Sequence, residues 1–231
     1  MAFIRHLLFF MLTPLVFIAV SLQSKYTLVW KPVVGDQLNY DVSMRTEMPE
    51  EAFTYQTKLK LKVIEVQKSG GYILESSTDK STLTVGKDEV ATENGPARRE
   101  VFDARGHRID YDSSLDEDPL NRVLGTICEF LPPPKSIEVG GKWKRNVEGD
   151  SKIGRMASLS SYTLKGPITS DWLVDYGYSE KGEKEPVTAL GQFVLSGKDF
   201  SIRSSSIVIK NVLIDPTAPR ATVTMSMVRE D

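Results

Sequence analysis

Cysteine and histidine are the residues that this chain has least of. Among 231 residues there is one cysteine, Cys128, and there are two histidines, His6 and His107. A single cysteine cannot form an intramolecular disulfide, so the fold has to be stabilised by packing alone. One His and one Cys at separate places also cannot fill a tetrahedral zinc shell. We therefore predict no zinc site and interpret Cys128 as a buried, unreactive thiol.

The scarcity of imidazole also disfavours a Ser-His-Asp hydrolase. Apart from His6 near the N-terminus, only His107 is available, and it follows Gly106 at the expected tip of a hairpin. A catalytic base has to be oriented by a third group, so we interpret His107 as a solvated loop residue. We predict no catalytic residue. A hydrolase that uses an unidentified carboxylate pair stays open as an alternative.

Signals for nucleotides and nucleic acids are absent as well. The chain has 29 Lys and Arg against 31 Asp and Glu, a formal net charge of −2, so we expect no nucleic-acid partner. Residues 177–184 have glycines spaced as in a phosphate-binding loop, but Glu183 stands where that loop needs a lysine. We predict no cofactor.

An acidic segment is the best candidate for a metal site. Its members are Asp110, Asp112, Asp116, Glu117 and Asp118. Their spacing begins like a calcium-binding loop, but Leu115 replaces the glycine required at the sixth position and Asn121 replaces the bidentate glutamate at the twelfth. We interpret the segment as a soluble linker whose charges favour the N-terminus of a following helix, and we predict no metal site.

Residues 1–24 have the three parts of a secretory signal peptide. Arg5 gives a positive start, residues 7–22 are an apolar run, and residues 19–21 supply the small side chains that signal peptidase reads. We expect cleavage after Ser21 or Ser24. The alternative is an uncleaved membrane anchor through residues 7–22, a run somewhat shorter than the roughly 20 residues of a spanning helix. Both alternatives export the remaining chain to the periplasm or the extracellular side.

Most of the exported part alternates between apolar and polar residues, as β-strands do. The alternation is clearest in residues 53–63, and after Val63 its phase shifts to Ile64, which predicts a β-bulge. Residues 103–106 predict a hairpin turn. The alternation recurs in residues 38–44, 172–178, 187–195, 202–214 and 221–227. About ten to twelve strands are expected, with surface loops in the polar residues 88–98, 148–156 and 179–186.

One stretch has the helical period instead. Its apolar stripe consists of Leu120, Val123, Leu124, Ile127, Cys128 and Leu131. Asp118 is a suitable N-cap, Pro119 suits the first helical position, and residues 132–134, all proline, prevent continuation. The pattern predicts an amphipathic helix over residues 119–131, packed on the apolar face of the sheet.

The predicted fold is mainly β: a large curved antiparallel sheet, in the form of a half-barrel or open barrel, with the one amphipathic helix on its concave face. Residues 25–231 are long enough to form a single β-rich domain. Residues 34–38 resemble residues 139–143, so two similar halves around helix 119–131 remain an alternative.

Two groups of surface candidates have a simple interpretation. Lys58, Lys60 and Lys62 lie on one face of a strand, where they could bind an anionic polymer, but alternating lysines more commonly keep a strand face soluble. Three tryptophans lie near strand beginnings, where we expect them in the core: Trp30, Trp143 and Trp172.

Three stretches resemble segments of uncharacterised exported bacterial β-rich proteins, namely residues 30–40, 102–109 and 131–143. At the level of fold, the expected strands and helix are similar to the half-barrels of periplasmic lipoprotein carriers. This resemblance implies a shared scaffold and transfers no catalytic residue.

These features support the hypothesis of an exported, non-enzymatic protein that binds a lipid or another apolar or amphiphilic molecule in the concave face of its sheet. The alternative is a structural or adaptor domain of the cell envelope, with a fully packed interior.

Overall fold

The computed structural model describes residues 24–92, 96–110, 127–149, 156–182, 184–214 and 217–230. The expected signal peptide therefore lies almost wholly outside the described residues. Thirteen strands are formed: β1 (Gln37–Glu47), β2 (Ala52–Val66), β3 (Tyr72–Thr78), β4 (Ser81–Val85), β5 (Asp88–Thr92), β6 (Arg98–Phe102), β7 (Arg108–Asp110), β8 (Lys142–Val147), β9 (Ser158–Ile168), β10 (Asp171–Glu180), β11 (Thr188–Leu195), β12 (Ile202–Val212) and β13 (Ala221–Glu230).

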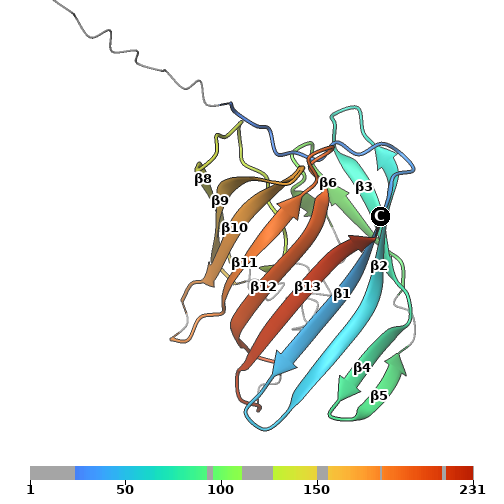
Figure 1. Cartoon of the computed structure of the whole chain (residues 1–231), viewed down its shortest axis with the longest axis vertical. Coiled ribbons are helices and arrows are strands. Elements are labelled where there is room, and N and C mark those ends of the chain that lie inside the picture. Colours follow the sequence, from blue (N-terminus) through green and yellow to red (C-terminus); the bar gives the residue numbers. More distant parts are fainter. Residues whose placement is uncertain are drawn as a thin grey trace, which may run out of the picture.

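The strands form one antiparallel sheet in the order β7-β6-β3-β2-β1-β13-β12-β11-β10-β9-β8, with β4 and β5 attached beside β2. The sheet is open and curved, and strands from the two ends of this order lie at its two sides (Figure 1). The prediction of a large curved antiparallel sheet is thus confirmed. The number of strands is thirteen, slightly above the ten to twelve expected.

The strands alternate between buried and exposed residues, as the sequence predicted. In β1 and β13 every second side chain is buried over most of the strand. The expected bulge is present, because the pairing of β2 with β3 shifts register between Val63 and Glu65. The expected hairpin joins β6 to β7, where Gly106 has a φ of 79°.

One predicted loop is wrong. Residues 88–92 of the expected loop 88–98 form β5, which pairs with β4 around a turn at Gly86. Val90 in this strand is 55% exposed, so the hairpin buries little and needs no apolar period. Similarly, residues 179 and 180 continue β10 rather than beginning a loop.

The predicted helix finds no support. Residues 119–126 lie outside the described part. Among the described residues Ile127 has π-helical geometry and Cys128 lies in a turn, and no helix is among the elements. Residues 129–131 have no regular secondary structure. The predicted burial of Ile127, Cys128 and Leu131 is confirmed. These residues therefore cover the sheet as expected, and side-chain hydrogen bonds from the sheet hold the carbonyls of residues 127, 129 and 131.

Candidate functional site

The concave face of the sheet forms the main apolar core. Its fully buried side chains include Met44, Leu164, Phe193, Ile207, Ile209 and Met225. Trp143 on β8, Tyr162 on β9 and Tyr176 on β10 are direct cross-strand neighbours, so three aromatic rings lie side by side at one end of this face. The rings of Trp143 and Tyr162 are stacked with centroids 5.1 Å apart.

This aromatic row holds the segment of residues 127–131, here called the cover segment. The Trp143 indole N–H donates to the Leu131 carbonyl at 2.8 Å, and the Tyr162 hydroxyl donates to the Glu129 carbonyl at 3.1 Å. The Tyr176 hydroxyl donates to the Ile127 carbonyl. Alternate carbonyls of the segment thus face the sheet, and each finds one side-chain donor there.

Phe130 anchors the cover segment through its ring. The ring is partly buried and meets Trp143, Tyr162 and Phe193 edge-on, with centroid distances of 6.3, 5.8 and 5.4 Å. Edge-to-face contacts at these distances are favourable and directional. The segment is therefore fixed by one inserted aromatic side chain and by three hydrogen bonds.

The neighbouring residue, Glu129, places a carboxylate in this apolar setting. Its Oε1 atom is buried and has no hydrogen-bond partner among the described residues. Burial raises the pKa of Glu129 to about 7, and the charges of Arg108 and Arg145 lower it by less than burial raises it. The carboxylate also accepts a hydrogen bond from the backbone N–H of Arg108.

Glu129 thereby lies between the two edges of the sheet. Arg108 begins the edge strand β7 and Arg145 belongs to the edge strand β8, and both act on the same carboxylate. The β6–β7 turn approaches the same place, because a Cβ on Gly106 would lie 3.3 Å from the Tyr72 hydroxyl and 3.7 Å from Pro132. The cover segment therefore fills the seam between the edges.

The N-terminal residues of the described chain close another side of this face. Tyr26 exchanges two backbone hydrogen bonds with Ile137, at 2.7 and 2.9 Å, and its ring lies 4.2 Å from that of Trp172. Leu28 is fully buried in the main core, and Trp30 packs against Tyr72 in a second, smaller cluster.

The inner face is not uniformly apolar. Thr46 on β1 and Ser205 on β12 are buried, and their hydroxyl oxygens have no hydrogen-bond partner among the described residues. An unsatisfied buried hydroxyl costs about 1–3 kcal/mol. Ser160, also buried, forms side-chain hydrogen bonds with Tyr162 and Tyr176.

The cysteine and the tryptophans singled out in the sequence lie where they were expected, whereas His107 does not. Cys128 is buried and free, and burial raises the pKa of its thiol, in agreement with an inert role. Trp30, Trp143 and Trp172 all pack in core clusters, as expected. His107 differs from its prediction: it is partly buried, and its Nδ1 lies 3.1 Å from Asp103 Oδ2.

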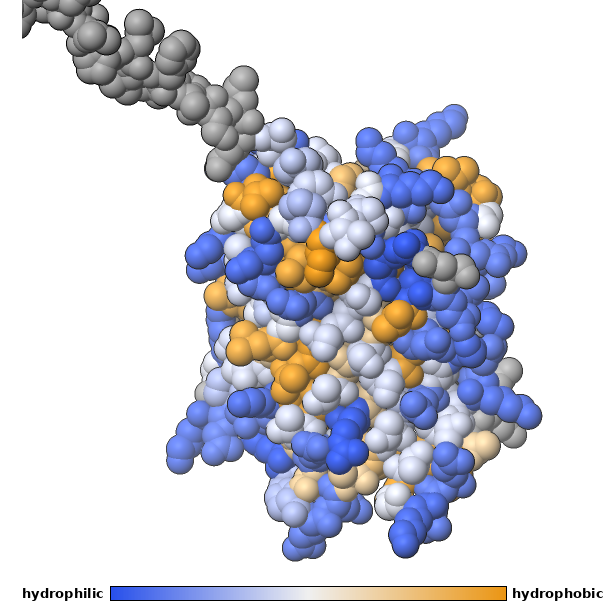
Figure 2. All heavy atoms as spheres, viewed as in Figure 1, coloured by the Kyte–Doolittle hydropathy of each residue, from blue (hydrophilic) through white to orange (hydrophobic). Residues whose placement is uncertain are grey.

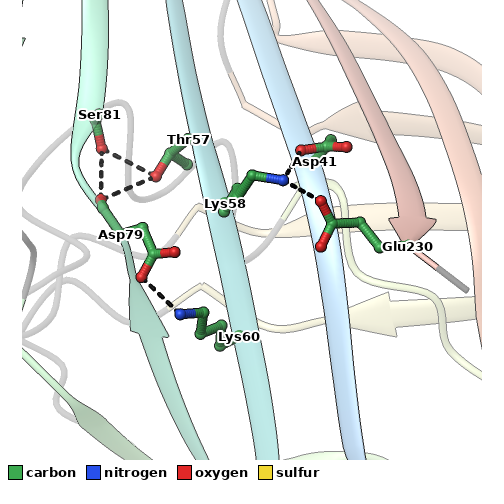
Figure 3. A network of polar contacts seen from close by, with 7 residues as sticks. All are labelled: Asp41, Thr57, Lys58, Lys60, Asp79, Ser81 and Glu230. Carbon is green, nitrogen blue, oxygen red and sulfur yellow. Dashed lines mark hydrogen bonds and ion pairs between the residues drawn. The ribbon is translucent and has the colours of Figure 1, made fainter.

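The lysine ladder lies on the outer face and is paired with acids. Lys58 contacts Asp41 at 3.0 Å and also Glu230, while Lys60 contacts Asp79 at 2.8 Å (Figure 3). These exposed pairs add little stability. Because carboxylates neutralise two of the three charges, the ladder matches the interpretation of a soluble strand face better than that of a polyanion site.

The acidic segment can be assessed only at Asp110, which is exposed, since its other members lie outside the described residues. Within the described ranges, no three His, Cys, Asp or Glu side chains come together as a metal site requires. In the same ranges, no helix has the length and apolar character of a membrane span.

Sequence reasoning missed Glu129, Arg108 and Arg145. They come from distant parts of the chain, and a sheet edge is recognisable only once the strand order is known. The sole local signal was an acidic residue, Glu129, next to three buried apolar ones.

Comparison with known proteins gives distant likenesses among solved structures. No family model matches the chain, and no curated protein does. Among solved structures, the chain is similar to one of lipid–protein interactions in lipovitellin, with 10% identity and a TM-score of 0.49 over 86% of this chain. It spans only 25% of that lipovitellin chain.

Two bacterial structures are similar over most of their length. One is the hypothetical lipoprotein YmcC from Escherichia coli K12, with 11% identity, a TM-score of 0.29, and coverage of 83% of this chain and 85% of that one. The other is a candidate outer membrane lipoprotein-sorting protein domain from Vibrio parahaemolyticus, with 12% identity, a TM-score of 0.25, and coverage of 84% and 83%. Proteins described as lipoproteins or as lipoprotein-sorting domains, which the sequence was predicted to resemble, are thus among the similar structures, but likenesses this distant carry no argument about ligand or activity.

Proposed function

We propose that this protein is an exported, non-enzymatic binding protein whose concave sheet face takes up a lipid or another apolar or amphiphilic molecule. The way in which the inner face is covered is the observation that carries this proposal. The described contacts of the cover segment with the aromatic row are side-chain hydrogen bonds and one inserted ring, Phe130. Such a cover can leave the face without breaking the pairing of the sheet.

Two further observations support uptake of a ligand. The inner face offers the broad apolar surface that such molecules need, as the buried cluster shows. It also contains the hydroxyls of Thr46 and Ser205, which have no partner among the described residues. A polar group on a bound molecule would satisfy them and remove their cost.

The second candidate function, a structural or adaptor domain of the envelope, is favoured by a different observation. Leu164, Phe193 and Ile207 on the inner face are 0% exposed, as in a permanently packed interior. In that case the cover segment is a fixed part of the core, and no ligand enters.

Purification from the exported fraction without detergent separates these two functions. We expect lipid extraction followed by mass spectrometry to recover close to one bound amphiphile per protein. Protein that is lipid-free after such a purification, and that takes up no lipid when mixed with vesicles of phosphatidylethanolamine and phosphatidylglycerol, would support the packed interior instead.

A matched pair of variants locates the binding face. Ile207 points inward and is fully buried, whereas the next residue, Val208, is 38% exposed on the outer face. We expect I207F to fill inner space and weaken binding of the apolar probe 1-N-phenylnaphthylamine, and V208F to leave it unchanged. Equal binding by the two variants and the wild type, all shown to be folded by circular dichroism, would contradict binding at the inner face.

A further inference from the structure

A polar site lies at one end of the apolar inner face, between the two edge strands β7 and β8 of the sheet. Its central residue is Arg145 on β8, whose Nη1 atom is buried and has no hydrogen-bond partner among the described residues. Ser160 is its direct cross-strand neighbour on β9, and Ser160 is bonded to the hydroxyls of Tyr162 and Tyr176. A partly buried arginine whose Nη1 atom is buried and unpaired, beside a group of hydroxyls, is suited to an anion.

The cover segment already places an anion there. The Glu129 carboxylate lies within the influence of Arg108 and Arg145 and accepts the Arg108 backbone N–H. One residue further on, Phe130 inserts an apolar ring against Trp143, Tyr162 and Phe193. Glu129 and Phe130 therefore place a charged group and an apolar group side by side, as the head and chain of an amphiphile do.

We infer that the ligand is an anionic amphiphile, whose charged head binds Arg145 and Arg108 in place of the Glu129 carboxylate and whose apolar chain takes the place of Phe130. This inference rests on the proposed function and names the chemistry of its ligand. The shared requirement is a carboxylate or phosphate attached to a long apolar chain, as in a fatty acid or an acidic phospholipid.

The groups around this site favour an anion over a cation. The cationic groups are Arg108 on β7 and Arg145 on β8, and the backbone N–H of Arg108 adds a donor. Of the carboxylates, Glu100 on β6 is engaged with Arg108 at 3.4 Å, and Asp103 is engaged with His107. Burial, together with the charge of Arg145, lowers the pKa of His107 and so disfavours its cationic form.

Glu129 is a weak competitor for these arginines. Its Oε1 atom finds no partner among the described residues, and burial raises its pKa to about 7. Its ionised form therefore carries an unfavourable desolvation cost in the closed state. An external anion that brings a longer apolar chain buries more surface than Phe130 and replaces the internal carboxylate.

Binding of three single-chain amphiphiles to the full-length protein tests the inference. Isothermal titration calorimetry at pH 8, below the critical micelle concentrations, compares dodecanoate, dodecyl phosphate and dodecyltrimethylammonium. We expect both anions to bind at least about tenfold more tightly than the cation, the gain typical of a charge-assisted contact. The tighter of the two anions identifies the preferred head group.

Three variants assign the effect to residues. R145Q should weaken binding of both anions about tenfold and leave the cation unchanged, and E129Q should strengthen anion binding because it removes the competing charge. K144Q is the matched control, since Lys144 is exposed and points to the other face of β8, and it should bind as the wild type does. If R145Q does not fold, R145K replaces it as the test, since it keeps the positive charge. The affinity of R145K for the anions should be lower than that of the wild type for the anions and higher than that of the wild type for the cation.

The outcomes separate the two proposals. Equal affinity for all three head groups, or an R145Q variant that binds anions as well as K144Q does, overturns the anionic head-group site while apolar binding stands. If none of the three amphiphiles binds, both the anionic head-group site and the proposed apolar binding function are overturned.

Discussion

Glu129 carries the most consequential side chain at the scale of single residues. Burial raises its pKa to about 7, and the nearby charges of Arg108 and Arg145 only partly offset this effect. The folded protein therefore holds the Glu129 proton more tightly than the unfolded chain does, where the pKa has its ordinary value of 4.5. This difference links stability to pH.

We expect Glu129 to contribute stability that is fully present below pH 4.5 and is lost as the pH rises through about 7. E129Q cannot ionise, so it does not lose this contribution. The free energy of unfolding of E129Q minus that of the wild type, measured in urea, should therefore increase with pH over this range, by at most about 3 kcal/mol. E65Q, which changes an exposed carboxylate, is the control. A difference between E129Q and wild type that does not vary with pH would contradict the assignment.

Cys128 makes a second prediction at this scale. Burial raises the pKa of its thiol, and the thiolate is the reactive form. We expect the native protein to react with Ellman's reagent at least about a hundredfold more slowly than protein unfolded in urea. A native rate equal to the unfolded rate would show that residues 127–131 are open in solution.

At the scale of elements, the cover segment differs from the strands in how it is held. Its backbone carbonyls accept hydrogen bonds from the side chains of Trp143, Tyr162 and Tyr176, and the Glu129 carboxylate accepts one from the backbone N–H of Arg108. A hydrogen bond of this kind contributes about 1 kcal/mol, so the segment should open at a lower free energy than the sheet unfolds.

Loss of one of these hydrogen bonds should loosen the cover segment without unfolding the sheet. We expect Y176F to lower the free energy of unfolding by about 1–2 kcal/mol, because it leaves the Ile127 carbonyl without its donor, and to speed amide hydrogen exchange in residues 127–131. Y178F is the matched control, since the described hydrogen bond of the Tyr178 hydroxyl joins it to Glu180 on the same strand. Unchanged exchange in Y176F would show that the segment is held in another way.

The sequence predicted the long strands well and the cover segment only in part. In β2 the alternation and even the bulge after Val63 could be read, because one face is dry and a phase shift is visible locally. The pair β4 and β5 could not, since β5 is exposed and most of β4 is only partly buried, which leaves no clear apolar alternation. In residues 127–131 the apolar spacing predicted burial correctly, but the same spacing cannot distinguish a helix from an irregular segment held by Trp143 and Tyr162.

At the scale of the whole molecule, the pairing of β1 with β13 joins the two arms of the sheet. Nine residue pairs are in register there, from Asn39 with Glu230 to Glu47 with Thr222. Strands β8–β13 form one meander, and the strands from β1 to β7 form the other arm. Because the β1–β13 pairing lies in the middle of the sheet, we propose that residues 25–231 form a single domain.

Deletion tests this unity. We expect removal of residues 221–230 to abolish cooperative thermal unfolding, because it takes β13 out of the centre and exposes the apolar neighbours Met44 and Ile207. Replacement of β5 by a Gly-Ser linker should leave a cooperative transition, since β5 pairs only with β4. An independently stable, cooperatively melting fragment without β13 would indicate two domains.

The same pairing sets the order of events when the chain is made. The ribosome synthesises β1 before every other strand of the sheet and β13 after all of them, yet these two strands are neighbours. One edge of β1 therefore stays unpaired until β13 has been synthesised, and contacts this remote in sequence form slowly. The central ladder of the sheet therefore cannot be completed before the last strand has been synthesised.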